Sequence, residues 1–166
     1  MGTEKVELKQ VLQVCVVVED IEKSMERYWE GYGIGPWDIY TFAPPGLTEP
    51  AIHGRPEPYT MKLATAQIGA VQWELIEPLT GPSIYAEFLQ EHGEGLHHVA
   101  VLVDDYDQTV AALAKRDIGV LMGGTWKGAT YAYMDTEKDL GAILEIYKMP
   151  PDFEMPAPEA RYPASD

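Results

Sequence analysis

The chain is poor in cysteine, in basic residues and in long apolar segments, and each shortage excludes certain classes of protein or site. Cys15 is the only cysteine among 166 residues, so an intramolecular disulfide and a zinc–cysteine cluster are both excluded. No apolar run approaches the roughly 20 residues that a membrane-spanning helix needs. Residues 1–10 are charged and lack the apolar segment of a secretory signal. These shortages predict a globular protein of the cytoplasm with no membrane partner.

Basic residues are strongly outnumbered by acidic ones. The 12 Lys and Arg residues stand against 27 Asp and Glu residues, which gives a formal net charge of −15 at pH 7. Nucleic acids and anionic membranes bind basic surfaces, so we expect neither as a partner. A polyanionic small molecule would need a local cluster of Lys and Arg, whereas the basic residues here are scattered. The charge balance therefore favours a neutral or cationic small molecule.

What the chain does contain is a duplicated strand–helix unit. In the first copy, the alternating apolar run 11–18 predicts a strand with Gln13 on its inner face, and a helix follows over 21–32. In the second copy, residues 96–103 form the corresponding strand, and a helix follows over 106–116. His98 stands in this second strand where Gln13 stands in the first.

Each copy later ends in an apolar strand with one carboxylate in its middle, Glu74 in the first and Glu145 in the second. A carboxylate buried in a strand is costly unless something cationic meets it. We therefore expect Gln13, Glu74, His98 and Glu145 to converge on one interior site. His97 has the opposite parity and should point toward a helix layer.

The rest of the chain predicts a single domain, residues 1–166, made of two halves at about 11–80 and 95–148. Residues 43–58 hold five prolines and two glycines, which predicts an insertion or mobile loop outside the core. Residues 149–166 hold five more prolines and predict an extended arm, either packed on a partner subunit or loose. The remaining predicted elements are strands at 37–42, 59–66, 71–76, 120–122, 129–134 and 142–147 and a linking helix at 84–90.

The two halves resemble the vicinal oxygen chelate (glyoxalase/bleomycin-resistance/dioxygenase) superfamily, and within it the methylmalonyl-CoA epimerases and related racemases. The resemblance covers roughly residues 11–148. It implies an α+β fold in which two βαβββ modules share an incomplete eight-stranded barrel. The motifs that carry it are Gly95-Leu96-His97-His98-Val99-Ala100, Trp73-Glu74-Leu75-Ile76-Glu77-Pro78 and Ile143-Leu144-Glu145-Ile146.

The resemblance also implies a divalent metal on the inner wall of the barrel, bound by Gln13, Glu74, His98 and Glu145. The family's first ligand is a histidine, and Gln13 stands in its place. An amide oxygen binds borderline-soft ions more weakly than imidazole does. This ligand set favours Mn, Co, Ni or Fe(II), or Mg at higher concentration, and disfavours a dioxygenase that needs two histidines and one carboxylate.

The implied reaction is racemisation or epimerisation of a carbon next to a carbonyl group, through an enolate. Glu145 is the candidate for one acid/base, and Tyr59 or Glu57 for the other. Cys15 and Tyr147 share the inward parity and are expected to line the substrate pocket.

The substrate is expected to be either an acyl-CoA or an uncharged ketone, the latter aromatic as in dihydroisoflavone-type racemases. Two rivals remain open: a metal-dependent lyase or glutathione-dependent isomerase of the same superfamily, and a metal-free drug-binding resistance protein. We expect a homodimer.

Overall fold

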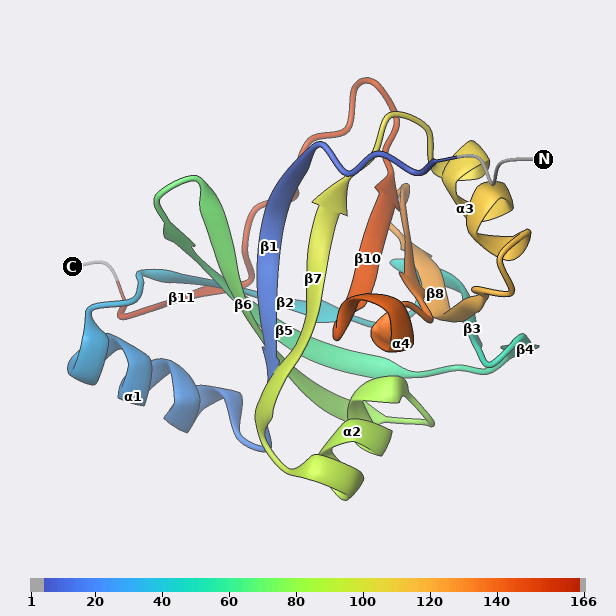
Figure 1. Ribbon diagram of the computed structural model, residues 1–166. Coiled ribbons are helices and arrows are strands. Elements are labelled where there is room, and N and C mark those ends of the chain that lie inside the picture. The colour runs from blue at the N-terminus through green and yellow to red at the C-terminus, as the bar shows by residue number, and fades with distance from the viewer. Residues whose placement is uncertain (1–4, 165–166) are drawn as a thin grey trace.

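The computed structural model describes residues 5–164 as one strongly curved sheet with helices outside it (Figure 1). In this part of the chain eleven strands follow the order β11-β2-β5-β6-β1-β7-β10-β9-β8-β3-β4. The strands are β1 (Gln10–Val17), β2 (Trp37–Phe42), β3 (Leu47–Ile52), β4 (Arg55–Pro56), β5 (Thr60–Ile68), β6 (Val71–Thr80), β7 (Gly95–Leu102), β8 (Val120–Trp126), β9 (Ala129–Met134), β10 (Ile143–Lys148) and β11 (Ala160–Tyr162). The helices are α1 (Ile21–Tyr32), α2 (Ile84–His92), α3 (Tyr106–Ala114) and α4 (Glu137–Leu140).

The central eight strands are two copies of one unit joined edge to edge. Strands β2, β5, β6 and β1 form the first half, and β7, β10, β9 and β8 form the second. The seam is the antiparallel pair β1–β7, in which Cys15 lies opposite His98. In each half the last strand lies parallel to the first, β6 beside β1 and β10 beside β7. The expected α+β fold, with two βαβββ modules forming an incomplete barrel, is confirmed.

The ends of α1 show how the sequence sets the repeat. The Asp20 side chain caps the first turn, and Gly33 takes a left-handed conformation (φ 66°) after the last turn. Asp105 caps α3 in the same way. Gln13 lies seven residues before Asp20, and His98 lies seven residues before Asp105. The two polar residues therefore occupy equivalent points of the two halves.

The three longer helices cover different surfaces of the sheet. Ile21 and Met25 of α1 pack on the outside of the first half, and Leu113 of α3 packs on the outside of the second. Tyr85 of α2 belongs instead to the inner cluster, so α2 closes one end of the barrel. None of the helices in residues 5–164 is long and apolar enough to span a membrane.

Residues 43–58, which the sequence predicts as an insertion or mobile loop, contain β3 and β4, so that prediction is wrong. Strand β3 leaves the first half and pairs with β8 of the second, and its Leu47 and Ile52 are buried. Next to this crossing, Phe42 at the end of β2 stacks on Trp126 at the end of β8, with ring centroids 4.1 Å apart. The prolines are tolerated because β3 and β4 lie at the edge of the sheet, where fewer ladder hydrogen bonds are needed.

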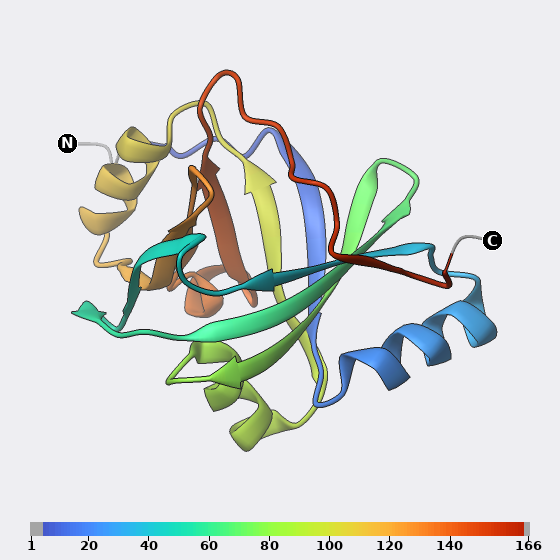
Figure 2. The same cartoon turned by 180° about the vertical axis from the view of Figure 1, so that it is seen from behind.

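The C-terminal arm packs on its own chain. Strand β11 pairs antiparallel with β2, and Arg161 lies opposite Asp38. The Arg161 Nε atom donates to Asp38 Oδ1 at 2.7 Å, and the Glu159 carboxylate accepts from the Thr41 backbone N–H at 2.8 Å. Figure 2 shows the segment before β11 passing from the end of β10 across the front of β1.

Two adjacent glycines in β8 let β8 and β9 pack closely. A Cβ atom on Gly123 would lie 2.6 Å from the Tyr131 carbonyl oxygen, which is a backbone atom and cannot move aside alone. We expect Gly123→Ala to lower the free energy of unfolding by about 1–3 kcal/mol through overpacking, measured by chemical denaturation. Gly119→Ala is the matched control, because its Cβ would meet nothing within 4 Å. Equal stability of the two variants would show that the close packing of β8 on β9 does not require Gly123.

Candidate functional site

The four polar residues predicted to converge lie on the four central strands. Gln13, Glu74, His98 and Glu145 come from β1, β6, β7 and β10, which are neighbours in the order β6-β1-β7-β10. All four are buried, with exposed fractions of 5% or less. The sheet therefore brings them to one inner wall, across the seam between the two halves.

Strand register adds Cys15 to this group. Cys15 lies opposite Glu74 on one side and opposite His98 on the other. The potential ligand atoms of these three residues lie within 4.8 Å of one another. A buried group of Cys, Glu and His could bind a metal ion, and this group contains Glu74 and His98 of the predicted ligand set together with Cys15, which was predicted as a pocket residue.

The imidazole of His98 is the centre of the site. Its Nε2 atom lies 3.1 Å from Glu145 Oε2 and 3.5 Å from Glu74 Oε2, yet it makes no well-aligned hydrogen bond. A fully buried ring nitrogen that faces two carboxylates without bonding to either fits a shared cation between them. The residues present therefore suit a divalent ion bound by His98, Glu74 and Glu145.

His97 orients this ring from behind. Its ring packs on Tyr85 and Phe88 of α2, with centroids 5.5 and 5.1 Å away, which confirms its predicted direction toward a helix. The Nδ1 atoms of His97 and His98 lie 2.9 Å apart, so one donates to the other. Burial and the neighbouring His98 lower the pKa of His97 to about 3, and its ring is hydrogen-bonded to the backbone of Ile84. We infer that neutral His97 donates to Ile84 and accepts from His98, which turns the His98 Nε2 atom toward the carboxylates.

Burial shifts the pKa values of the charged groups in the site, and the interactions among these groups act against those shifts. Burial raises the pKa of Glu74, although the neighbouring His98 and Cys15 side chains work against this rise. Burial would lower the pKa of His98, but the facing Cys15 and Glu145 groups outweigh it and raise that pKa well above its usual range. Burial raises the pKa of Cys15 to about 12, so Cys15 is a thiol at neutral pH. The buried carboxylates are therefore stabilised by positive charge next to them.

A hydrogen-bonded chain holds Gln13 in place. The Tyr147 hydroxyl lies 2.8 Å from Gln13 Oε1 and 2.9 Å from Glu145 Oε2 and can donate to either. Gln13 Nε2 donates to Gln72 Oε1 at 2.6 Å. The amide oxygen of Gln13 is thereby turned toward Glu145. Gln72 is a site residue that the sequence did not predict, although it lies two residues before Glu74 on the same face of β6.

A cavity of about 620 Å³ opens beside this wall. Gln13, Glu74 and Tyr147 line it on one side, and residues of the C-terminal arm line it on another. Its volume is typical of sites for small organic ligands. Cys15 lies behind this lining, next to Glu74 and His98.

Tyr59 and Glu57, the sequence candidates for the second acid/base, lie outside this lining. The Tyr59 side chain is buried, and its hydroxyl donates to the Gly123 carbonyl at 3.0 Å and is hydrogen-bonded to Tyr131. Glu57 follows the edge strand β4, and its backbone N–H bonds to Pro50. The structure brings neither residue to the metal-ligand group.

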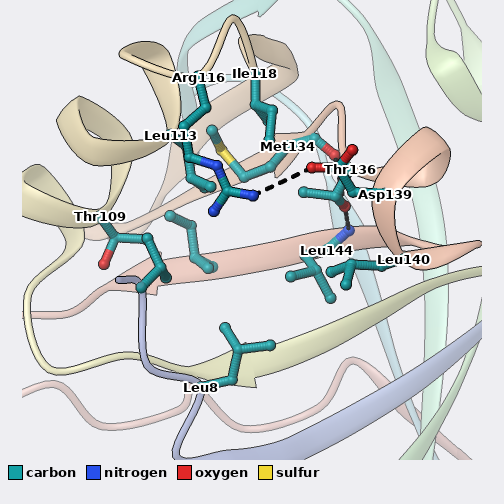
Figure 3. Close-up of a pocket in the computed structure, with 12 residues that line it drawn as sticks. Leu8, Thr109, Leu113, Arg116, Ile118, Met134, Thr136, Asp139, Leu140 and Leu144 are labelled. Atoms are coloured by element: carbon teal, nitrogen blue, oxygen red, sulfur yellow. Dashed lines mark hydrogen bonds and ion pairs between the residues drawn. The ribbon is translucent and has the colours of Figure 1, made fainter. Parts of the chain in front are cut away.

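A smaller cavity of about 130 Å³ lies on the outside of the second half, between α3, α4 and β10 (Figure 3). Its walls are mostly apolar, and its charged pair, Arg116 and Asp139, is joined by a 3.3 Å contact. No cluster of metal-ligating side chains faces it in residues 5–164. The inner cavity is therefore the candidate site.

Comparison with known proteins agrees with this geometry. Residues 12–133 match the family model of the Glyoxalase/Bleomycin resistance protein/Dioxygenase superfamily. The chain belongs to this superfamily. Uncharacterized protein YqjC of Bacillus subtilis is 31% identical over 93 residues, which span 54% of this chain and 66% of that protein.

Solved structures show the same superfamily fold at low sequence identity. A methylmalonyl-CoA epimerase of Streptomyces coelicolor, in complex with 2-nitronate-propionyl-CoA, is 20% identical with a TM-score of 0.64, over 90% of this chain and 100% of the other. The methylmalonyl-CoA epimerase of Mycobacterium tuberculosis is 19% identical with a TM-score of 0.60, over 91% and 93%. At this identity the likeness establishes the shared glyoxalase-type fold alone.

If the inner-wall group binds a metal ion, adding Mn²⁺, Co²⁺ or Ni²⁺ should raise the melting temperature. At a hundredfold excess over the dissociation constant, linkage predicts about 2.7 kcal/mol of stabilisation. His98→Ala should abolish this effect, whereas His92→Ala, which alters an exposed helix residue, should keep it. Differential scanning fluorimetry provides the measurement. A wild-type protein that is indifferent to all three metals would refute the ligand assignment.

Gln13→His should increase metal affinity, because imidazole is the stronger ligand for these ions. The expected gain is about tenfold or more in the dissociation constant, measured by calorimetric titration with Co²⁺ or Ni²⁺. The Gln72→Ala variant tests the orientation of Gln13 and should weaken binding. Unchanged affinity in both variants would remove Gln13 from the ligand set.

Proposed function

We propose that the protein is a metal-dependent racemase or epimerase that inverts a carbon next to a carbonyl group. The observation that carries the proposal is the unsatisfied His98 Nε2 atom, which faces Glu74 and Glu145. Of these three residues Glu74 lines the cavity, and His98 and Glu145 lie buried behind it. This arrangement combines a place for a cation with a carboxylate that can accept a proton. The superfamily also contains other enzymes and non-enzymatic proteins, and we propose this reaction on the chemistry of the buried group.

The chemistry required is a proton transfer next to a carbonyl. A divalent ion bound at His98, Glu74 and Glu145 would supply a Lewis acid for the substrate's carbonyl oxygen. The C–H bond breaks as a carboxylate, for which Glu145 is our candidate, accepts the proton, and the electron pair moves toward the carbonyl oxygen as an enolate. An acid on the other face then returns a proton to the same carbon. No atoms are gained or lost.

The Tyr147 hydroxyl supports Glu145 in this role. It contacts both Glu145 Oε2 and Gln13 Oε1, so it limits the positions that the carboxylate can adopt. Tyr147 also lines the cavity, and its hydroxyl, 2.9 Å from Glu145 Oε2, links the cavity to the carboxylate behind it. The substrate is a small carbonyl compound, either an acyl-CoA or an uncharged ketone.

Turnover in heavy water should put solvent deuterium on the inverted carbon, without oxidation or cleavage of the substrate. Glu145→Gln should reduce this exchange by at least a hundredfold, because it removes a ligand charge and the proposed base. Glu91→Gln, in an exposed part of α2, serves as the control and should retain full exchange. Mass spectrometry and NMR of the recovered substrate measure the label.

Tyr59→Phe and Glu57→Gln, tested separately, examine the second acid/base. Neither side chain lines the cavity, so we expect both variants to keep most of the exchange. Loss of exchange from one enantiomer alone in either variant would identify that residue as a one-sided base. Activity that consumes dioxygen or yields two fragments would reject the racemase proposal.

A further inference from the structure

Beyond the metal-ligand group, most of the cavity wall is apolar. Among the described residues that line it, none is Lys or Arg. Aromatic side chains supply much of the wall, chiefly Tyr40, Phe42, Trp126 and Tyr131. Such a surface buries flat apolar rings favourably and offers nothing to an anion.

The charged groups near the cavity make it unfavourable for phosphates. The carboxylates in its lining are Asp38 and Glu74, and both are acidic neighbours for any anion. Two of the nearby cations are ion-paired, since Arg161 contacts Asp38 at 2.7 Å and Lys148 contacts Asp107. A third, Lys127, lies over the ring of Trp126 at 5.1 Å and is not part of the cavity lining. A coenzyme A thioester carries several phosphate charges, and the described lining of the cavity offers it no Lys or Arg, on a chain with a net charge of −15.

The C-terminal arm supplies the remaining wall. Met149, Phe153 and Met155 line the cavity from this arm. Met149 and Met155 are each 49% exposed, so they leave apolar surface that a bound ligand can bury. The arm is anchored beyond them by β11, with Glu159 bonded to both the backbone and the hydroxyl of Thr41 at 2.8 and 2.9 Å.

We infer that the site takes an uncharged, largely apolar carbonyl compound of about two rings and excludes acyl-CoA thioesters, with the arm as its specificity-determining wall. This inference rests on the proposed function in one respect: the carbonyl group is placed at the side of the cavity that Gln13 and Glu74 line, next to the buried His98 and Glu145. The rings then lie between Trp126 and the arm. It selects one of the two substrate classes that the reaction type allows.

The test is a binding measurement that needs no turnover. The full-length protein, loaded with Co²⁺, is titrated with 2-phenylcyclohexanone and separately with propionyl-CoA, and the fluorescence of Trp126 and the other tryptophans reports binding. We expect the ketone to bind at least tenfold more tightly than the thioester. Phe153→Ala and Met155→Ala should each weaken binding of the ketone, and Phe153→Ala should raise its dissociation constant by about tenfold. Asp152→Ala alters an exposed neighbour on the same arm and should leave binding unchanged.

Every result of this titration either supports or overturns the inferred ligand class. Tighter binding of propionyl-CoA, equal binding of both compounds, binding of neither, or indifference to both arm variants would overturn it. The same two compounds are then incubated in heavy water to separate this inference from the proposed reaction. A ketone that binds as expected but takes up no deuterium supports the ligand class and counts against the racemase. Exchange into the thioester alone supports the racemase and overturns the ligand class.

Discussion

Two carboxylates and one imidazole, buried together on the inner wall, impose the main constraint on this structure. Removing Glu74 and Glu145 from water is costly unless positive charge accompanies them. His98 stands between them, and its raised pKa shows the strength of that demand. The surroundings are organised to satisfy it: His97 fixes the ring from behind, Tyr147 contacts Glu145, and α2 closes the end of the barrel. The polar centre thus dictates much of the aromatic packing around it.

The sequence predicted those parts of the fold that local chemistry determines. The bounds of α1 follow from the Asp20 cap and the Gly33 terminus, and the structure has the same bounds. The inward parity of Gln13, Glu74, His98 and Glu145 follows from the two-residue period of strands. These features need no knowledge of distant contacts, so the sequence is sufficient for them.

The features that the sequence did not predict depend on pairing between segments that are far apart in the chain. Prolines in 43–58 concealed β3, whose partner β8 lies some 70 residues away in the chain, and only the buried Leu47 and Ile52 hinted at a strand. The three-residue β11 was likewise concealed in a proline-rich tail, where nothing local specifies pairing with β2. At the site, the bond between Tyr147 and Gln13 depends on two strands that are not neighbours in the sheet. The alternation of side chains along a strand predicts that both residues point into the barrel, but it does not predict that they are in contact.

The seam between β1 and β7 has a consequence for how the molecule matures. Gln13 and Tyr147 are separated by 134 positions in the chain, and the site draws residues from both halves. Loop closure over such distances makes these contacts among the slow ones to form. During synthesis β1 and β6 emerge first and can pair with each other, whereas Glu145 and Tyr147 arrive only when β10 has left the ribosome. The centre is therefore complete only when the last strand of the barrel is in place, and a chain interrupted before β10 would expose an unfinished, acidic interior.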